Sequence, residues 1–445
     1  MTSPTGRTGA PGEPVRRPPG ATGGVETLTA ATVRAQAPRA AGQPDAPEIR
    51  RVVRQRVAKR RKQRRRAVYL QSAFSVLAVA ALVVLIVVGW RSAMRITGGR
   101  DELVTDPEAP GYVAEVRPTP VELVAITGDG GELISMLLVV STPGRSSAVP
   151  LSPQLTLWEF EESPPSSALD VFADGGLEAL RLRLGADLGF GTTSGIVVPG
   201  SALVQLASTV GPLTINLADD VFAGEPDAEP DDVELQYPSG ELELEPEVVD
   251  DFLAFVGYRE PDPNRALRSG EVWQALLERV DPASAAALGD GEDLERFSQL
   301  FAELSQGEVS FQVVPTTPLE LYIEPPVVIH RLDEEAMPDW ASTHVPFPVA
   351  AYPGQLASVA VLDGTGQDGA IEAVSPDIVS AGAQISLTGN AESFEVATTR
   401  VEYRSEQAKG AAQDIADALG VQAQKVDELR ADVDVTVVVG KDLLG

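Results

Sequence analysis

The sequence predicts an α/β protein that follows a single membrane-spanning helix, and three observations support this prediction. Short runs rich in β-branched residues alternate with helix-like segments from about residue 119 to the end. Residues 67–90 contain no Asp, Glu, Lys or Arg, and they are long enough to cross a hydrocarbon core of about 30 Å. A Pro-rich stretch at residues 324–357 is expected to be a linker between a larger and a smaller α/β domain.

Charged residues are distributed unevenly on the two sides of the apolar run. Residues 1–66 contain 16 Lys and Arg against 4 Asp and Glu, whereas the remaining chain contains 19 against 61. Lys and Arg beside a first spanning helix stay on the cytoplasmic side, so we expect a cytoplasmic N-terminus and an extracytoplasmic C-terminus in the cell membrane. The chain has no cysteine, so the outer part is expected to be stabilised by packing without disulfides.

The segments around the apolar run are predicted from their composition. Residues 1–48 are rich in Pro, Gly, Ala and Thr and nearly lack large apolar side chains, which predicts a disordered cytoplasmic tail. Residues 49–66 are polybasic and either mark topology at the inner leaflet or bind nucleic acid or anionic lipid. Residues 91–118 are expected to be a short stalk. The acidic outer part excludes nucleic acid as its partner, because phosphate binding requires a basic face.

The larger outer domain, residues 119–323, is predicted to have strands and helices in mixed order. Strands are expected at residues 121–126, 133–141, 155–160, 195–199, 213–217, 310–314 and 319–323. Helices are expected at residues 167–184, 201–210, 245–256, 264–280 and 293–304. The acidic residues 219–234 are expected to be a solvated loop. This mixed order indicates helices packed on a central sheet.

The smaller domain, residues 358–445, shows the same alternation. Strands are expected at residues 358–362, 384–387, 399–403 and 433–439, and helical residues at 377–381 and 405–419. Ser405 is expected to cap the last helix, and Gly420 is expected to end it. This pattern predicts a compact α/β domain of its own.

Four short segments of the smaller domain together resemble one known domain. They are residues 361–366 (VLDGTG), 389–391 (GNA), 398–399 (TT) and 439–442 (VGKD). As a set they are similar to the C-terminal domain of bacterial LytR-CpsA-Psr cell-envelope proteins. Asp363 stands where that family usually has Asn.

The larger domain resembles the catalytic domain of the same family. The matching segments are residues 210–215 (VGPLTI), 237–240 (YPSG), 255–259 (FVGYR) and 262–268 (DPNRALR), the last being similar to the family's Asp-x-x-Arg-x-x-Arg signature. The resemblance implies that the domain binds a polyprenyl-diphosphate-linked glycopolymer with Mg²⁺ and transfers the polymer to the cell wall. The implied partners are this glycopolymer or lipid, the cytoplasmic membrane and other members of the family.

The candidate diphosphate-binding residues are Arg259, Asp262, Arg265 and Arg268. Asp262 is expected to cap a helix that places Arg265 and Arg268 on one face near its positive end. An anion there would be bound by backbone N–H groups and two guanidinium groups. The alternative is that carboxylates neutralise these arginines as solvated surface pairs; the carboxylates are those of Glu260, Asp262 and Glu271.

Several residues that the family uses are replaced in this chain. The sequence LSPQL at residues 151–155 stands in place of Ser-Ile-Pro-Arg-Asp, and ELIS at residues 132–135 replaces Arg-Ser-Asp-Thr. Gly257 stands where Arg is usual, and Ser269 stands where Gln is usual. We therefore expect a degenerate site, without catalytic residues or metal, and a binding or regulatory role in cell-wall assembly. The alternative is an active phosphotransferase that uses Mg²⁺.

Overall fold

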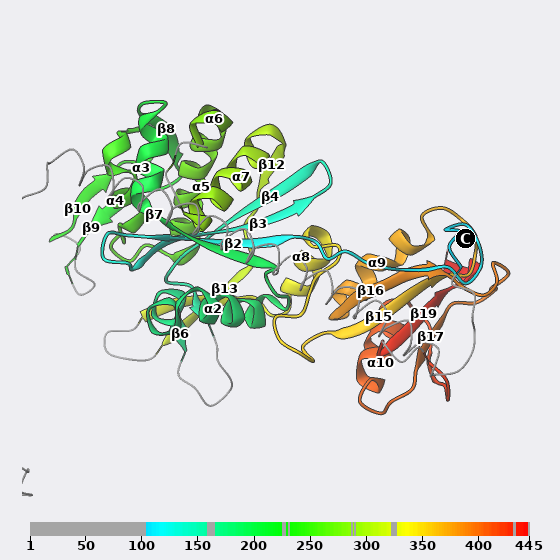
Figure 1. Ribbon diagram of the computed structural model, residues 1–445. Coiled ribbons are helices and arrows are strands. Elements are labelled where there is room, and N and C mark those ends of the chain that lie inside the picture. Colours follow the sequence, from blue (N-terminus) through cyan, green and yellow to red (C-terminus); the bar gives the residue numbers. More distant parts are fainter. Residues whose placement is uncertain are drawn as a thin grey trace, which may run out of the picture. The chain divides into compact units, whose positions relative to one another are not determined.

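The structure is a computed structural model that describes most of the chain after residue 103 (Figure 1). The described residues are 104–157, 165–224, 228–229, 232–285, 288, 291–321, 327–429 and 433–443, and they belong to the compact unit Glu102–Gly445. The expected tail, polybasic segment and apolar run at residues 1–48, 49–66 and 67–90 lie outside the described residues. Within those ranges, no helix is both long and apolar enough to cross a membrane.

A five-stranded mixed sheet forms the centre of the larger domain, in the order β12-β4-β3-β2-β7. Its strands are β2 (Val121–Thr127), β3 (Leu133–Thr142), β4 (Arg145–Leu151), β7 (Ser194–Pro199) and β12 (Glu308–Phe311). Successive side chains of β2 enter two different cores: Val124 and Ile126 pack on one face of the sheet, and Leu123 and Ala125 on the other. The predicted sheet buried between two layers is thus present.

Helices supply the other half of each core (Figure 1). The first core includes residues of α3 (Gly200–Ser208), α4 (Val249–Ala254), α5 (Asp262–Arg279), α6 (Pro282–Ala285) and α7 (Glu292–Gln306). The second core includes residues of α2 (Ala168–Leu188) and α8 (Met337–His344). Helix α5 matters most for the site, because its buried Trp273 and Leu276 fix it against the sheet.

Three smaller sheets lie beside the central sheet. β8 (Leu213–Leu217) pairs with β11 (Gly240–Leu244), and β9 (Val221–Ala223) pairs with β10 (Glu234–Tyr237), both antiparallel. The third contains β13 (Thr316–Leu321), β14 (Val327–Leu332), β5 (Thr156–Leu157) and β6 (Ser166–Ser167). The acidic stretch expected to be a loop therefore contains β9 and the start of β10. A short 3-10 turn, Pro246–Val248, precedes α4.

The smaller domain is built on a six-stranded sheet in the order β1-β16-β15-β19-β17-β18. Its elements are β1 (Val113–Glu115), β15 (Ala357–Asp363), α9 (Ala370–Ser380), β16 (Ala383–Asn390), β17 (Arg400–Tyr403), α10 (Lys409–Ala418), β18 (Ala423–Lys425), β19 (Val435–Val439) and a 3-10 turn (Lys441–Leu443). Helices α9 and α10 share one core with β15 and β19. The strands and helices predicted in this domain are present, but α10 begins at Lys409 and its capping residue is Ala408, not Ser405 as expected. Ser405 Oγ accepts a hydrogen bond from Ala408 N at 3.1 Å and so stabilises the turn before the helix.

The segment expected to be a stalk contributes an edge strand to this sheet. β1 pairs antiparallel with β16, and Asn390 Nδ2 donates hydrogen bonds to the carbonyls of Pro107 and Ala109 at 2.8 and 2.9 Å. A side chain at Gly389 would overlap the carbonyl oxygen of Tyr112, so glycine is required for this close approach. Residues 104–116 are therefore part of the smaller domain, although the whole larger domain lies between them and β15 in the sequence.

The Pro-rich stretch at residues 324–357 also differs from the expected linker, because it contains β14 and α8. Pro338 lies in the first turn of α8, where a missing N–H costs the helix nothing. Pro318 lies in β13, whose only partner strand among the described residues is β14. β13 is thus an edge strand, where the missing N–H of proline is tolerated. Proline content misled the prediction because these positions tolerate proline within regular structure.

Candidate functional site

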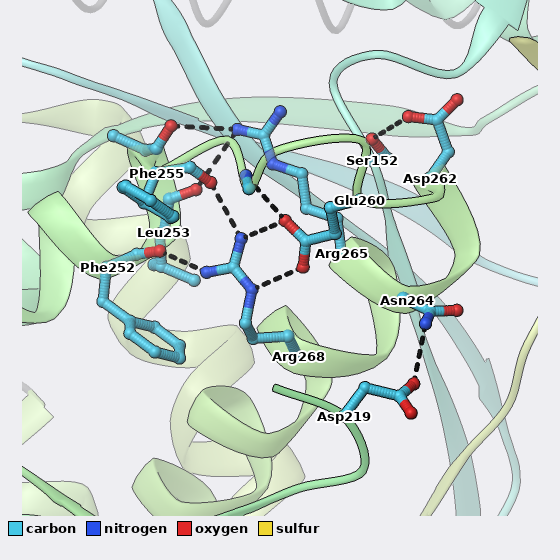
Figure 2. A network of polar contacts seen from close by, with 12 residues as sticks. Ser152, Asp219, Phe252, Leu253, Phe255, Glu260, Asp262, Asn264, Arg265 and Arg268 are labelled. Carbon is cyan, nitrogen blue, oxygen red and sulfur yellow. Dashed lines mark hydrogen bonds and ion pairs between the residues drawn. The ribbon is translucent and has the colours of Figure 1, made fainter. Parts of the chain in front are cut away.

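Helix α5 carries three of the four candidate residues, Asp262, Arg265 and Arg268 (Figure 2). The fourth, Arg259, lies in the turn just before the helix. The helix begins at Asp262 and is preceded by Pro261 as the capping residue, so Asp262 is the first helical residue and not the cap that we expected. Arg265 and Arg268 are both buried, at 5% and 4% exposure. The helix thus turns its two arginines inward, away from solvent.

All three guanidinium nitrogens of Arg268 donate hydrogen bonds to neighbouring protein groups. Its Nε and Nη2 bind the two carboxylate oxygens of Glu260 at 2.9 and 3.0 Å, and Nη1 and Nη2 donate to the carbonyls of Phe252 and Phe255 at 2.6 and 2.8 Å (Figure 2). The Glu260 side chain is only 8% exposed. The alternative of a neutralised arginine is therefore found here, but as a buried bidentate pair and not as a solvated surface pair.

Arg265 is only partly satisfied. Its Nη2 donates to the carbonyls of Leu253 and Ala254 at 3.3 and 3.2 Å, while Nε and Nη1 are buried and have no hydrogen-bond partner among the described residues. Burial, and then the charge of Arg268, lower the pKa of Arg265 to about 10. An unpaired buried donor costs roughly 1–3 kcal/mol, so this guanidinium has capacity for a further acceptor.

Asp262 joins two residues that are distant in the sequence. Its carboxylate accepts a hydrogen bond from Ser152 Oγ at 3.0 Å and lies 3.7 Å from His330 Nδ1. Burial raises the pKa of Asp262 above its ordinary value, although the bond from Ser152 and the charges of His330 and Arg265 act in the opposite direction. The cost of burying the ionised Asp262 carboxylate is therefore larger than the stabilisation that Ser152, His330 and Arg265 provide.

We expect Asp262→Asn to increase the free energy of unfolding at neutral pH relative to the natural chain. Because the folded-state pKa is raised, ionised Asp262 destabilises the native state, and this penalty disappears as the pH falls through that pKa towards 3.8, the ordinary value. The difference between variant and natural chain should therefore shrink to zero when unfolding is measured from about pH 7 down to about pH 3.5.

Asp281→Asn is the matched control for this measurement. Hydrogen bonds from Ser284 lower the pKa of Asp281, so its ionised form stabilises the native state and the substitution should act with the opposite sign at neutral pH. A difference between Asp262→Asn and the natural chain that stays constant with pH would contradict the assignment.

Arg259 differs from the other candidates because it is exposed. Its guanidinium lies over the Tyr258 ring at 4.9 Å from the centroid, and its backbone has φ of 51°. Among the described residues it is the one non-glycine residue with positive φ, a conformation that costs roughly 1–3 kcal/mol and is concentrated at functional sites. The strain marks Arg259 as a residue whose position is imposed by its surroundings.

A pocket of about 300 Å³ lies beside α5 and receives Arg259 and Arg268 but not Arg265 or Asp262. The residues that line it come from the β8–β9 region and the start of α5; they are Asn216, Leu217, Ala218, Asp219, Asp220, Val221, Phe222, Tyr258, Arg259, Glu260, Pro261, Asn264, Leu267, Arg268 and Glu271. Two of the four candidate residues, Arg259 and Arg268, thus line this pocket, and the other two, Asp262 and Arg265, do not. The buried cluster at the start of α5 consists of Arg265, Arg268, Asp262 and their neighbours Glu260, Ser152 and His330, and it meets the pocket at Arg268 and Glu260.

Three residues of the buried cluster were not among the candidates. Ser152 lies in the segment that replaces the family's Ser-Ile-Pro-Arg-Asp, so its place in the motif was the signal that could have identified it. Glu260 precedes the helix and was expected on the surface. His330 lies in the stretch that was expected to be a linker, but β14 carries it to Asp262. No sequence pattern relates residues 68 positions apart in this way.

The residues around α5 do not fit a bound Mg²⁺. In the part of the chain that the structure describes, no group of three or more His, Asp or Glu side chains is arranged to hold a metal ion. Glu260 is occupied by Arg268, and Asp262 has cationic or potentially cationic neighbours in Arg265 and His330. A hard divalent cation requires several convergent oxygen ligands, which this cluster does not offer.

Comparisons with known proteins support one part of the expected resemblance directly. Residues 357–443 match the family model described as LytR cell envelope-related transcriptional attenuator, which confirms the expected C-terminal domain. No curated protein matches the chain.

Several solved structures are similar to about half of the chain. TagV of B. subtilis is 13% identical, with 51% of this chain and 98% of that chain covered and a TM-score of 0.37. A protein from Streptococcus agalactiae is 17% identical, with 51% and 88% covered and a TM-score of 0.38. A transcriptional regulator from Enterococcus faecalis is 14% identical, with 50% and 86% covered and a TM-score of 0.35.

Proposed function

We propose, from the premise that residues 357–443 form a LytR cell envelope-related domain, that the chain is a single-pass cell-envelope protein whose larger domain binds without catalysing transfer. Its ligand is a cell-wall glycopolymer or the polyprenyl-diphosphate lipid that carries it. The apolar run at residues 67–90, with the basic residues before it, supports a cytoplasmic N-terminus and an extracytoplasmic C-terminus.

The observation that carries this proposal is that the guanidinium of Arg268 already donates hydrogen bonds to protein oxygens from all three of its nitrogens. Phosphoryl-group sites depend on several cations whose N–H groups are free to converge on the anion. In this chain, Nε, Nη1 and Nη2 of Arg268 all donate to protein oxygens, and the bidentate partner Glu260 would repel a diphosphate. Arg268, the last residue of the segment that resembles the family's Asp-x-x-Arg-x-x-Arg signature, therefore serves the fold, which supports binding elsewhere on the domain over transfer here.

A second candidate, the phosphotransferase, is favoured by one observation. Nε and Nη1 of Arg265 are buried without a partner among the described residues, and a phosphate oxygen would satisfy them. Arg265 also lies near the start of α5, where backbone N–H groups favour anions. This candidate requires the Arg268–Glu260 pair to open when the ligand binds.

The proposal is tested with the full chain in lipid nanodiscs and a purified glycopolymer, supplied either free or linked to polyprenyl diphosphate. We expect saturable binding of the polymer in both forms, and Arg265→Gln should leave the affinity unchanged within about two-fold, because the polymer is bound outside the buried cluster. Absence of binding to either form would reject the proposal. A dependence of affinity on Arg265 would favour the second candidate.

A further inference from the structure

We propose that the pocket beside α5 binds a zwitterionic α-amino-acid group, an ammonium and a carboxylate on one carbon, carried on an aliphatic stem. The pocket has a volume of about 300 Å³, which is within the range of small-molecule sites. Its lining combines fixed carboxylates, one unpaired guanidinium and an apolar rim. This inference goes beyond the glycopolymer function and does not depend on it.

Three carboxylates of the pocket are held in place by protein donors. The bonds run from Asn264 Nδ2 to Asp219 at 2.8 Å, from Ser239 N to Asp220 at 2.7 Å and from Asn216 N to Glu271 at 3.0 Å. Asp219 and Glu271 each accept this bond through one oxygen, and their other oxygen has no partner among the described residues, whereas Asp220 also accepts a bond from the Ser239 side chain. An ammonium group has three N–H donors and no acceptor, so it is the natural complement of such fixed oxygens.

The hydrogen bonds also fix the charge of the pocket. Those from Ser239 lower the pKa of Asp220, so this carboxylate stays ionised well below neutral pH. The fourth carboxylate, Glu260, is neutralised by Arg268 and is closed to a ligand. The carboxyl groups of Asp219, Asp220 and Glu271 therefore share the pocket with a single available guanidinium, that of Arg259, and this excess of acidic groups disfavours a ligand that is purely anionic.

Arg259 is kept apart from these carboxylates although it lines the same pocket. It forms no ion pair with a described residue, and its guanidinium instead lies over the Tyr258 ring. A guanidinium binds a carboxylate through two parallel hydrogen bonds. Opposite charges that share a pocket without pairing are complementary to a ligand that carries both charges.

The rim of the pocket is apolar and exposed. Phe222 and Leu267 line it at 36% and 45% exposure, and Leu235, at 52% exposure, lies directly opposite Phe222 in the β9–β10 pair. Covering such side chains is favourable by roughly 25 cal/mol per Å². The aliphatic stem attached to the charged head group would cover these apolar side chains and shield them from water.

The test compares three probes of equal stem length by calorimetry on the full chain in nanodiscs. Norleucine carries both charges, pentylamine only the ammonium, and hexanoate only the carboxylate. We expect norleucine to bind at least about ten-fold more tightly than either single-charge probe, because each charged hydrogen-bonding group contributes at least a factor of this size. Equal binding of pentylamine would show a non-specific acidic surface and overturn the proposal, as would the absence of norleucine binding.

Variants locate the site. Arg259→Asn removes the charge but keeps a residue that tolerates positive φ, and Asp220→Asn removes one acceptor charge with little change of shape. Each should weaken norleucine binding roughly ten- to hundred-fold. Arg117→Asn and Glu303→Gln make the same changes of charge outside the pocket and should have no effect. Loss of binding in these controls, or full binding in both pocket variants, would contradict the assignment.

One further probe distinguishes the two sources of such a group. Nε-acetyl-lysine has a free α-amino-acid head, and its far end mimics attachment through an amide. Binding at least as tight as that of norleucine supports a head group presented on a peptide or polymer. Weaker binding supports a free amino acid as the ligand.

Discussion

Replacing Arg268 with methionine is expected to destabilise the larger domain by roughly 3–5 kcal/mol, the usual cost of leaving one partner of a buried ion pair uncompensated. Methionine keeps the apolar stem but leaves the Glu260 carboxylate, at 8% exposure, without its cation. The carbonyls of Phe252 and Phe255 would lose their donor at the same time. These carbonyls end α4 and begin the turn towards α5, so the loss should loosen that junction.

The loss is measured by denaturant unfolding of the full chain, followed by hydrogen exchange of α5 and α4. A local readout is needed because a chain with more than one domain does not unfold in a single two-state step. The double variant Arg268→Met/Glu260→Gln should recover part of the loss, because the side chain at position 260 then no longer carries an uncompensated buried charge. Glu178→Gln breaks the exposed Arg181–Glu178 pair and should cost less than about 1 kcal/mol. A loss equally small for Arg268→Met would show that the buried pair does not support the fold.

Gly389→Ala is expected to displace β1 from the sheet of the smaller domain. The added methyl group would overlap the carbonyl oxygen of Tyr112, a backbone atom that cannot move away without breaking the β1–β16 pairing. Overpacking of this kind costs roughly 1–3 kcal/mol, so hydrogen-exchange protection within residues 111–116 should fall roughly ten- to hundred-fold.

Gly410→Ala provides the matched control for this prediction. A methyl group at Gly410 meets no atom within 4 Å, and alanine is favourable in the helix α10 that contains it. This variant should keep full protection at β1. If Gly389→Ala keeps it as well, β1 is not a fixed part of the smaller domain, and residues 91–118 are better described as the stalk that the sequence predicts.

Much of the fold could be predicted because its core strands carry a strong local signal. The runs that became β2, β3, β7 and β8 are dense in β-branched and aliphatic residues, and a Gly-rich turn separates the first two. β1 was missed because three residues of ordinary composition gain their strand conformation only from β16. β9 and β10 were missed because acidic residues and proline surround them, although pairing between the strands stabilises both.

The candidate site could be predicted as a location but not as an arrangement. The Asp-x-x-Arg-x-x-Arg spacing led to the start of α5, where the arginines indeed lie on one face. The partners of these residues depend on tertiary contacts. A carbonyl of α4 accepts a hydrogen bond from Arg268. β14 brings His330 to Asp262, and β14 was not predicted because its segment is rich in proline. The spacing of the sequence therefore predicted where the charged residues lie. Tertiary packing determines which of their hydrogen-bonding groups remain free to bind a ligand.

Turnover of the lipid-linked glycopolymer tests the central claim most directly. The full chain in nanodiscs is incubated with a polyprenyl-diphosphate-linked glycopolymer, a peptidoglycan acceptor and Mg²⁺, and release of polyprenyl phosphate is followed. We expect binding without turnover, because Arg268 is engaged by Glu260 and the described carboxylates near α5 do not form a metal site. Polyprenyl phosphate released at a rate that Arg265→Gln or Arg268→Met abolishes would contradict the account and establish a working transferase site.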